Sequence, residues 1–365
     1  MTEWKECKLG DVVFFSNGKS RPDTSGYIPI YGGNGILEYT DQSNNDGETI
    51  IIGRVGAYCG SVYYENRPVW VSDNALAAKP KEQYYAKYLY YLLKFSDLNQ
   101  YAEGSSHPLL TQSLLNSIDI VFCDNIDEQK AIAEVLSSLD DKIDLLTRQN
   151  KTLEDIAQAY FRKWFIEDAS DEWEIKKLRD FGEIICGKTP PTTNKKFFNG
   201  NIPFIKIPDM HNNVYIFDTA DTLSEMGAKY QENKFIPPMS ICVSCIATVG
   251  LVSMNVFLSQ TNQQINSLIP KHDKYRYYLF LFLRSYRDEL LALGSGGTMT
   301  LNINKTLFGD IECYCPDDEI LFRFNNVVNP LFGKIYNNCK QIRILSKLRN
   351  TLLPKLISGE IRVKM

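Results

Sequence analysis

The sequence is poor in residues typical of catalytic centres and has no long hydrophobic run. Only three histidines occur in 365 residues, at positions 107, 211 and 272, and no Ser/His/Asp or Cys/His spacing stands out. No apolar run approaches the roughly 18 residues of a membrane-spanning helix, and the polar start does not resemble a signal peptide. We therefore expect a non-catalytic protein of the cytoplasm.

The cysteines do not form a pattern typical of disulfides or zinc. There are nine, an odd number, and they are scattered, so reduced thiols are expected. Cys242 with Cys245 and Cys313 with Cys315 could together offer four thiolates, but the first pair lies in an apolar segment with the pattern of a strand. A spacing of three on a strand places the two side chains on opposite faces, which favours buried structural cysteines and no metal site.

Strong positive charge is also missing. The net charge is −4, which argues against a surface that binds nucleic acid over its whole area. The charge is unevenly distributed, however: residues 126–170 carry 6 basic and 10 acidic side chains, whereas residues 317–365 carry 9 and 4.

The chain contains an internal repeat. Glu3-Trp4, Leu9, Asp11, Gly18-Lys19 and Pro22 recur without a gap, 169 residues later. After an insertion in the second copy the offset becomes 190, as in Gly60 and Gly250 or Pro80 and Pro270. Because 365 residues suffice for two or three folding units, the repeat predicts two similar domains.

Each copy has the pattern of an α+β domain. β-branched and aromatic runs bounded by Gly, Asn and Pro predict strands, and one segment per copy has helical spacing of apolar residues. The predicted strands are Thr49 to Ile52, Val69 to Val71, Ile241 to Val243 and Val252 to Leu258, and the predicted helices are Tyr84 to Phe95 and Lys274 to Leu293.

A heptad pattern follows each copy. Apolar residues alternate spacings of four and three from Ile132 to Trp164 and again from Leu321 to Leu356, with Pro354 expected to end the second helix. The polar Asn150 lies at an a position, where it either fixes the register of a helix pair or is a solvated interruption of an ordinary amphipathic helix. The residues predicted to pair the helices are Ile132, Leu136, Leu139, Ile143, Leu146, Asn150, Leu153, Leu331, Ile335, Asn338, Ile342 and Leu345.

These two stripes are the only comparable ones in the chain, so they are expected to pair with each other. The opposite charges of the two segments support this pairing. The 39 residues from Ile126 to Trp164 would form a rod of roughly 58 Å. The predicted fold is therefore α+β, with two similar domains at opposite ends of an antiparallel pair of long coiled-coil helices and a pseudo-two-fold internal repeat.

Two segments match or resemble enzyme sequence motifs, but neither has the secondary structure around it that the motif requires. Gly182 to Thr189 matches the P-loop pattern, yet Thr189 precedes Pro190 and is disfavoured from starting a helix, and the first copy lacks the pattern. Asn329-Pro330-Leu331-Phe332 is similar to a motif of adenine methyltransferases but lies inside the heptad stripe. Neither motif predicts nucleotide hydrolysis or methyl transfer by this chain.

Glycine-bracketed polar loops recur at matching places in both copies. Glycine lets backbone approach a ligand closely, and Lys, Arg, Ser, Thr and Asn offer donors to phosphates and base edges. Ordinary turn chemistry would explain any one such loop, but their recurrence favours a function.

The sequence resembles the specificity subunits of type I restriction-modification systems along its whole length. The resemblance is carried by Trp4 to Asp11 and Trp173 to Asp180, the Gly-Lys-Thr-Pro-Pro run 187–191, Gly294 to Thr300, Glu128 to Leu139, Gln158 to Phe165, and Leu348 to Val363.

The resemblance implies two target-recognition domains, each reading one half of a bipartite site in double-stranded DNA, with the helices fixing the unread gap. It further implies two methyltransferase subunits docked around the helices, with S-adenosylmethionine bound there, and ATP-driven restriction subunits outside. The expected domains are 1–125 and 169–316, with spacer helices in 126–168 and 317–365. The chain itself would bind no cofactor.

Combining the loops with this resemblance gives candidate DNA-binding residues. They are Lys19, Ser20, Arg21, Arg54, Ser105, Ser106, His107, Lys188, Thr189, Lys206, Ser295, Thr298, Thr300, Asn302 and Asn304. Two other hypotheses remain at this point: a nucleotide hydrolase using Gly182 to Thr189, and a coiled-coil scaffold that binds proteins without recognising DNA.

Overall fold

A computed structural model describes residues 4–81, 83–104, 108–294 and 302–363. The chain divides into two compact units, Met1–Asp144 with Arg343–Met365, and Leu145–Ile342. Both long helices cross the division, so each unit combines one α+β domain with a segment of each helix. Among the described residues, no helix is both long and apolar enough to cross a membrane.

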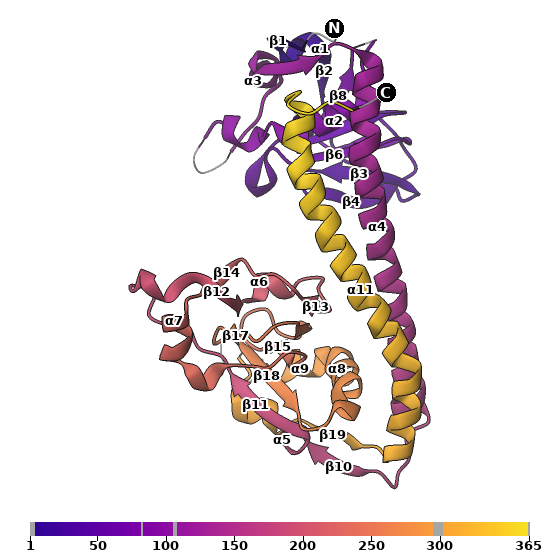
Figure 1. Cartoon of the computed structure of the whole chain (residues 1–365). Helices are drawn as coiled ribbons and strands as arrows, with labels where there is room; N and C mark the ends of the chain where they lie inside the picture. The colour runs from indigo at the N-terminus through magenta and orange to yellow at the C-terminus, as the bar shows by residue number, and fades with distance from the viewer. Residues whose placement is uncertain (1–3, 82, 105–107, 295–301, 364–365) are drawn as a thin grey trace. The chain divides into compact units, whose positions relative to one another are not determined.

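The first unit is built on the antiparallel sheet β2-β8-β5-β6, against which helix α2 packs (Figure 1). A second sheet has the order β4-β3-β7, and β1 pairs with β9. Its strands are β1 (Trp4–Lys8), β2 (Val13–Asn17), β3 (Ile28–Gly32), β4 (Gly35–Thr40), β5 (Thr49–Gly53), β6 (Val62–Glu65), β7 (Trp70–Val71), β8 (Ala75–Pro80) and β9 (Asp119–Cys123). Its helices are α1 (Leu9–Val12), α2 (Ala86–Phe95), α3 (Gln112–Ser117) and the 3₁₀ turns η1 (Gly56–Tyr58) and η2 (Leu98–Tyr101).

The second unit contains the five-stranded sheet β11-β18-β15-β16-β13, the three-stranded sheet β14-β12-β17 and the pair β10-β19. Its strands are β10 (Glu174–Lys177), β11 (Gly182–Cys186), β12 (Phe198–Ile205), β13 (Tyr215–Ile216), β14 (Asp221–Leu223), β15 (Ile241–Ser244), β16 (Val252–Asn255), β17 (Gln260–Thr261), β18 (Ile265–Pro270) and β19 (Glu312–Cys315). Its shorter helices are α5 (Leu178–Phe181), α6 (Ile207–Met210), α7 (Glu225–Tyr230), α8 (Arg276–Ser285), α9 (Arg287–Gly294), α10 (Lys305–Gly309) and the 3₁₀ turns η4 (Lys195–Phe197), η5 (Glu232–Lys234) and η6 (Asp273–Tyr275).

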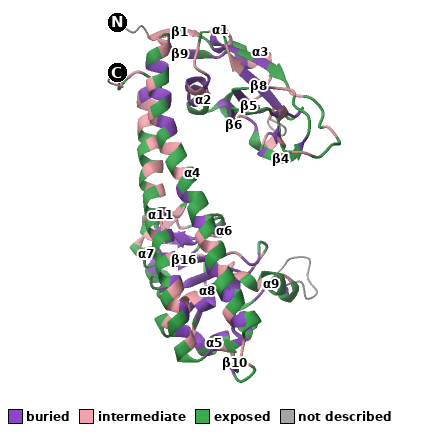
Figure 2. Ribbon diagram, turned by 90° about the vertical axis from the view of Figure 1, so that its right-hand side faces the viewer, coloured by how far each residue is buried: buried purple, intermediate pink, exposed green. Residues whose placement is uncertain are grey.

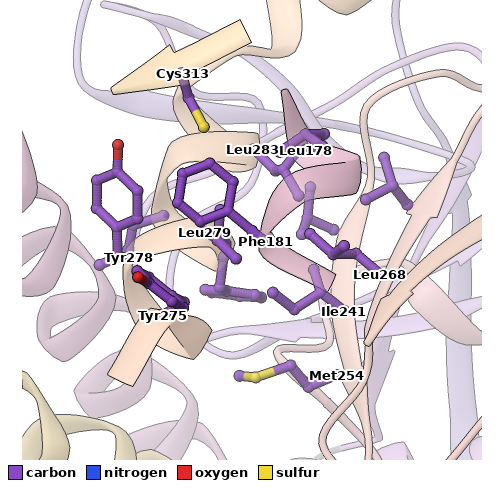
Figure 3. Close-up of a cluster of buried hydrophobic side chains, with 14 of the residues drawn as sticks. Leu178, Phe181, Ile241, Met254, Leu268, Tyr275, Tyr278, Leu279, Leu283 and Cys313 are labelled. Atoms are coloured by element: carbon purple, nitrogen blue, oxygen red, sulfur yellow. The ribbon is translucent and has the colours of Figure 1, made fainter. Parts of the chain in front are cut away.

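Aromatic and aliphatic side chains form the core of the second unit. Figure 3 shows Leu279 and Leu283 of α8 together with Ile241 of β15, Met254 of β16 and Leu268 of β18. The prediction of a single helix from Lys274 to Leu293 is wrong. Helix α8 ends before Tyr286, whose backbone (φ −88°, ψ 19°) leaves the helical region, and α9 begins at Arg287. Asp288 and Glu289 then lie in the first turn of α9, where acidic side chains favour a new helix start.

Three of the four cysteines of the zinc hypothesis, Cys242, Cys245 and Cys313, are buried, and Cys315 is half-buried. Cys242 and Cys245 are almost completely inaccessible, and burial raises the pKa of each thiol to about 12. They therefore stay protonated near neutral pH, as structural thiols do. In the part of the chain that the structure describes, no group of three or more His, Cys, Asp or Glu residues could hold a metal ion.

The two long helices are α4 (Ile126–Arg162, 37 residues) and α11 (Asp318–Ile357, 40 residues). The helical segment predicted to reach Trp164 continues after Arg162 as a π-helix, Lys163–Glu167. The expectation that Pro354 ends α11 is wrong, since the helix runs three residues further. Burial of Leu356 and Ile357 in the core of the first unit offsets the backbone hydrogen bond that proline cannot make.

None of the twelve residues predicted to pair the helices is exposed. The buried ones are Ile132, Leu136, Leu146, Asn150, Ile335 and Asn338, and the half-buried ones are Leu139, Ile143, Leu153, Leu331, Ile342 and Leu345. In the first unit, Ile132 and Leu136 of α4 share a cluster with Leu356 of α11. In the second unit, Leu153 of α4 packs against the cluster that contains Ile335 of α11.

Each unit also contains polar contacts between α4 and α11. In the first unit Arg349 Nη1 lies 2.6 Å from Asp140 Oδ1, with both side chains about three-quarters buried. In the second unit Asn338 Nδ2 donates to Asn150 Oδ1 (2.9 Å), and Asn150 Nδ2 donates to Cys339 Sγ (3.4 Å). Asn150 is therefore a paired, buried residue rather than a solvated interruption.

Breaking the asparagine pair should destabilise the second unit. In Asn338→Ala the Asn150 oxygen loses its donor inside the helix interface, so we expect the free energy of unfolding to fall by about 1–3 kcal/mol. Asn150→Leu combined with Asn338→Leu should recover most of this loss, because no buried polar group is then left unpaired. Urea titrations measure both effects.

The exposed Gln149, next to Asn150 on α4, offers a control, and Gln149→Ala should change stability by no more than about 0.5 kcal/mol. An Asn338→Ala variant as stable as this control would contradict a structural role for the pair.

Candidate nucleic-acid interface

The glycine-bracketed loops of the first unit come together beside the ends of its strands. The first loop cluster is defined as residues 18–21, 53–60, 71–75 and 108–110. Gly18 N donates to Ala75 O (3.2 Å), and Lys19 N donates to Val71 O (3.0 Å). The backbone of Arg54 joins the other two segments, since its N donates to Asn74 O (3.0 Å) and its O accepts from Leu110 N (2.9 Å).

The second unit repeats these hydrogen bonds. The second loop cluster is defined as residues 187–191, 244–250, 261–265 and 302–304. Gly187 N donates to Ile265 O and Lys188 N to Thr261 O, both at 3.0 Å. Cys245 takes the place of Arg54, because its N donates to Gln264 O (2.7 Å) and its O accepts from Ile303 N (2.9 Å). These four backbone hydrogen bonds are therefore equivalent in both clusters, whereas the side chains beside them differ.

Close backbone packing explains the glycine at the start of each cluster. A Cβ on Gly18 would overlap the backbone oxygen of Ser72, and a Cβ on Gly187 would overlap the backbone oxygens of Thr261 and Asn262. Only glycine fits at these two positions without moving a strand end, so the neighbouring Lys19 and Lys188 are held in equivalent places.

Arg54 is the least exposed candidate in the first loop cluster. Its side chain is half-buried, and its Nε is buried without a hydrogen-bond partner among the described residues. The Cys59 Sγ donates to its backbone oxygen (3.2 Å), and burial raises the pKa of this thiol, which keeps the donor proton in place. Lys19 and Ser20 are exposed on the neighbouring loop.

The second loop cluster contains the candidates Lys188, Thr189, Asn302 and Asn304, and Lys206 lies outside the residues that define it. Lys188 is exposed, and Thr189 Oγ1 donates to Gln263 Oε1 (2.6 Å). Asn302 is exposed, and its backbone forms an isolated antiparallel β-bridge with Ile246. Lys206 follows strand β12, which pairs with β17 just before the polar turn 262–264. The Nζ of Lys206 lies 2.6 Å from Asp221 Oδ2.

Two further candidates within the loop clusters have structural partners, and six candidates lie outside the described residues. Arg21 Nη1 is paired with Glu38 Oε1 of β4 (3.0 Å). Asn304 is the N-cap of α10, because its side chain accepts from Leu307 N (3.0 Å). Ser105, Ser106, His107, Ser295, Thr298 and Thr300 lie outside the described residues.

The sequence interpretation missed the polar turn between β17 and β18 and its counterpart between β7 and β8. Asn262, Gln263 and Gln264 stand 190 residues after Ser72, Asp73 and Asn74. Asn74 and Gln264 of these turns accept the hydrogen bonds from Arg54 N and Cys245 N. A short polar run repeated at the same offset was the available signal.

The P-loop pattern has no P-loop conformation. Gly182 to Cys186 form strand β11, and residues 187–191 continue as an irregular loop, so Thr189 does not start a helix. A phosphate would therefore find no helix N-terminus after this glycine-lysine pair.

Two α+β units with one shared loop framework and different loop side chains define a class of duplicated recognition protein. The chain belongs to the family described as type I restriction modification DNA specificity domain, which it matches at residues 1–155 and 170–352. This membership gives no support to the scaffold hypothesis.

Individual relatives agree with this assignment. The chain is 36% identical to the type I restriction enzyme HindI specificity subunit of Haemophilus influenzae, over 99% of this chain and 100% of that protein. It is 30% identical to the type I restriction enzyme MjaIX specificity subunit of Methanocaldococcus jannaschii, over 100% and 90%. The crystal structure of the type I system S subunit from M. genitalium has the same fold, with a TM-score of 0.66, 17% identity and coverage of 98% of this chain and 96% of that one.

Proposed function

We propose that the chain is the DNA sequence-recognition subunit of a type I restriction-modification complex. The observation that carries the proposal is the pair of loop clusters: they share their backbone hydrogen bonds but present different side chains, Arg54 in one and Cys245 in the other. Two readers of common design and different side chains suit two half-sites of different sequence. The domains would be 1–125 and 169–316.

Each loop cluster would face the major groove. Lys19 and Lys188 would contact phosphates or guanines, and Arg54 would donate to the O6 and N7 acceptors of a guanine. Ser20, Thr189, Asn302 and the polar turns would assist. Among the described residues the Arg54 Nε has no hydrogen-bond partner, which supports this role, because a buried donor without an acceptor costs about 1–3 kcal/mol and an acceptor from DNA would satisfy it.

The helices α4 and α11 would form an antiparallel coiled-coil pair with one domain at each end, related by a pseudo-two-fold repeat. Two contacts support this arrangement: Asp140 of α4 meets Arg349, and Asn150, further along α4, meets the earlier residue Asn338. At 1.5 Å per residue, the 37 residues of α4 span about 56 Å, or about 16 base pairs as an upper limit for the unread gap.

The chain would perform no chemistry itself. Two methyltransferase subunits with S-adenosylmethionine would dock around the helices, and restriction subunits would bring ATP-driven cleavage, all in the cytoplasm. Figure 2 shows many exposed residues along α4 and α11. The exposed apolar residues of α11 include Phe322, Ile344 and Leu348. Apolar side chains left in solvent support docking of a partner.

Arg54→Ala tests the reading role. Selection of bound duplexes from a randomised pool by the full chain with its methyltransferase subunits should give a two-part motif, and the variant should relax one position in one part. Binding to the wild-type motif should fall by about 1–3 kcal/mol, since one bidentate base contact is lost.

The exposed Arg67, which is paired with Glu65 3.1 Å away, supplies the control, and Arg67→Ala should leave the motif unchanged. Selection of unrelated sequences by the wild-type protein would contradict the proposed function.

A further inference from the structure

The second unit carries a patch of lysines around one exposed tyrosine. This patch adjoins the second loop cluster. The lysine patch is defined as Lys188, Lys195, Lys196, Lys229 and Tyr230. Its members come from the loop after β11, from η4 and from α7. Lys188 corresponds to Lys19 of the first unit, whereas the other four residues lie between Pro191 and Gly250, where the offset of the repeat changes from 169 to 190. Of the five, only Lys188 was a candidate from the sequence.

Packing of η4 against α7 places these residues together. Ser224 Oγ donates to Lys196 O (2.6 Å), and Ser224 N donates to Phe197 O (2.9 Å). The rings of Phe197 and Tyr230 lie 5.1 Å apart between centroids. Gly227 allows this contact, since a Cβ there would overlap the backbone oxygen of Phe197.

Lys188 is attached to the same patch. Its Nζ lies 5.5 Å from the centroid of the Tyr230 ring, and its backbone oxygen accepts from Gln231 Nε2 (2.8 Å). Gln231 is buried and also donates to Gln260 Oε1 (2.8 Å), so a buried amide network ties the loop after β11 to α7.

The charges of the patch are not neutralised by the chain. All four lysines are exposed, and within the described residues none of them forms an ion pair. The segments 188–200 and 224–234 contain five lysines and two glutamates, Glu225 and Glu232. This local excess of positive charge contrasts with the net charge of −4 of the whole chain.

We propose that the lysine patch is a phosphate-binding surface for the DNA backbone beside the half-site that the second loop cluster reads. This inference rests on the proposed function. It adds residues that determine the affinity for DNA rather than the sequence that is recognised. Lys195, Lys196 and Lys229 neutralise phosphates, while the exposed Tyr230 ring holds the Lys188 ammonium in place through a cation–π contact. Such contacts position the duplex and carry no base information.

Salt dependence of duplex binding by the full chain tests the inference. Between about 50 and 200 mM salt, each phosphate contact contributes about 0.9 to the slope of log affinity against log salt. Lys195→Gln with Lys196→Gln should therefore reduce the slope by about 2. Tyr230→Leu should weaken binding about 2- to 5-fold, whereas Tyr230→Phe keeps the ring and should bind like the wild type.

The double variant Lys176→Gln with Lys177→Gln removes the same charge from β10 and should leave the slope unchanged. A steep slope in the wild type that persists in the Lys195/Lys196 variant would overturn the lysine patch alone. A change in the selected half-site sequence would also overturn it, because the residues would then read bases. Absence of any salt-dependent binding by the wild type would overturn the proposed function itself.

Discussion

Gly187→Ala is expected to abolish recognition of one half-site while the other half-site is still read. The new Cβ would overlap the backbone of Thr261 and Asn262, so the loop that carries Lys188 must move away from the polar turn. Loss of two base contacts, at about 1–3 kcal/mol each, corresponds to binding to the full site that is weaker by at least about 30-fold. Gly18→Ala should do the same for the opposite half-site, because its Cβ would overlap Ser72.

Binding to duplexes with one half-site randomised measures this effect. Gly333→Ala is the control, since nothing lies within 4 Å of a Cβ there and alanine favours the helix. If Gly187→Ala and Gly18→Ala weakened the same half-site, the two loop clusters would not be separate readers.

Removing one heptad from each long helix is expected to shorten the unread gap and leave both half-sites unchanged. Deletion of residues 140–146 and 343–349 removes the Asp140–Arg349 pair together, keeps Asn150 opposite Asn338 and preserves the apolar pattern. Seven residues at 1.5 Å correspond to about 10 Å, or about 3 base pairs.

Motif mapping of the deletion variant measures the gap directly. Deletion of residues 140–146 alone is the control, because it shifts one helix against the other and should abolish recognition rather than shorten the gap. An unchanged gap, or altered half-site letters, in the paired deletion would contradict the role of the helices as a spacer.

Local pattern was sufficient to predict much of this fold. Runs such as Thr49 to Ile52 and Ile241 to Val243 lie in strands β5 and β15, because β-branched residues alternate or cluster as buried strands require. The twelve residues predicted to pair the helices are buried or half-buried, because spacings of three and four place them on one face of each helix. The extension of α11 beyond Pro354 was not predictable, since it depends on burial of Leu356 and Ile357 by residues distant in the sequence.

The site was predictable only in outline. Gly18 and Gly187 mark their loops in the sequence, but the partners of individual side chains do not follow from local pattern. Arg21 faces Glu38 and Asn304 caps α10, which gives both residues a structural partner that the sequence did not reveal. Four of the five residues of the lysine patch lie where the offset of the repeat changes, so the repeat could not point to them.

The central claim is that one chain carries two readers held at a fixed separation. Mapping of methylated bases across the genome of cells that carry this gene tests it most directly. We predict a bipartite motif with a constant gap of fewer than about 16 base pairs, lost when the gene is deleted. A single continuous motif, or a bipartite motif that survives the deletion, would contradict the account.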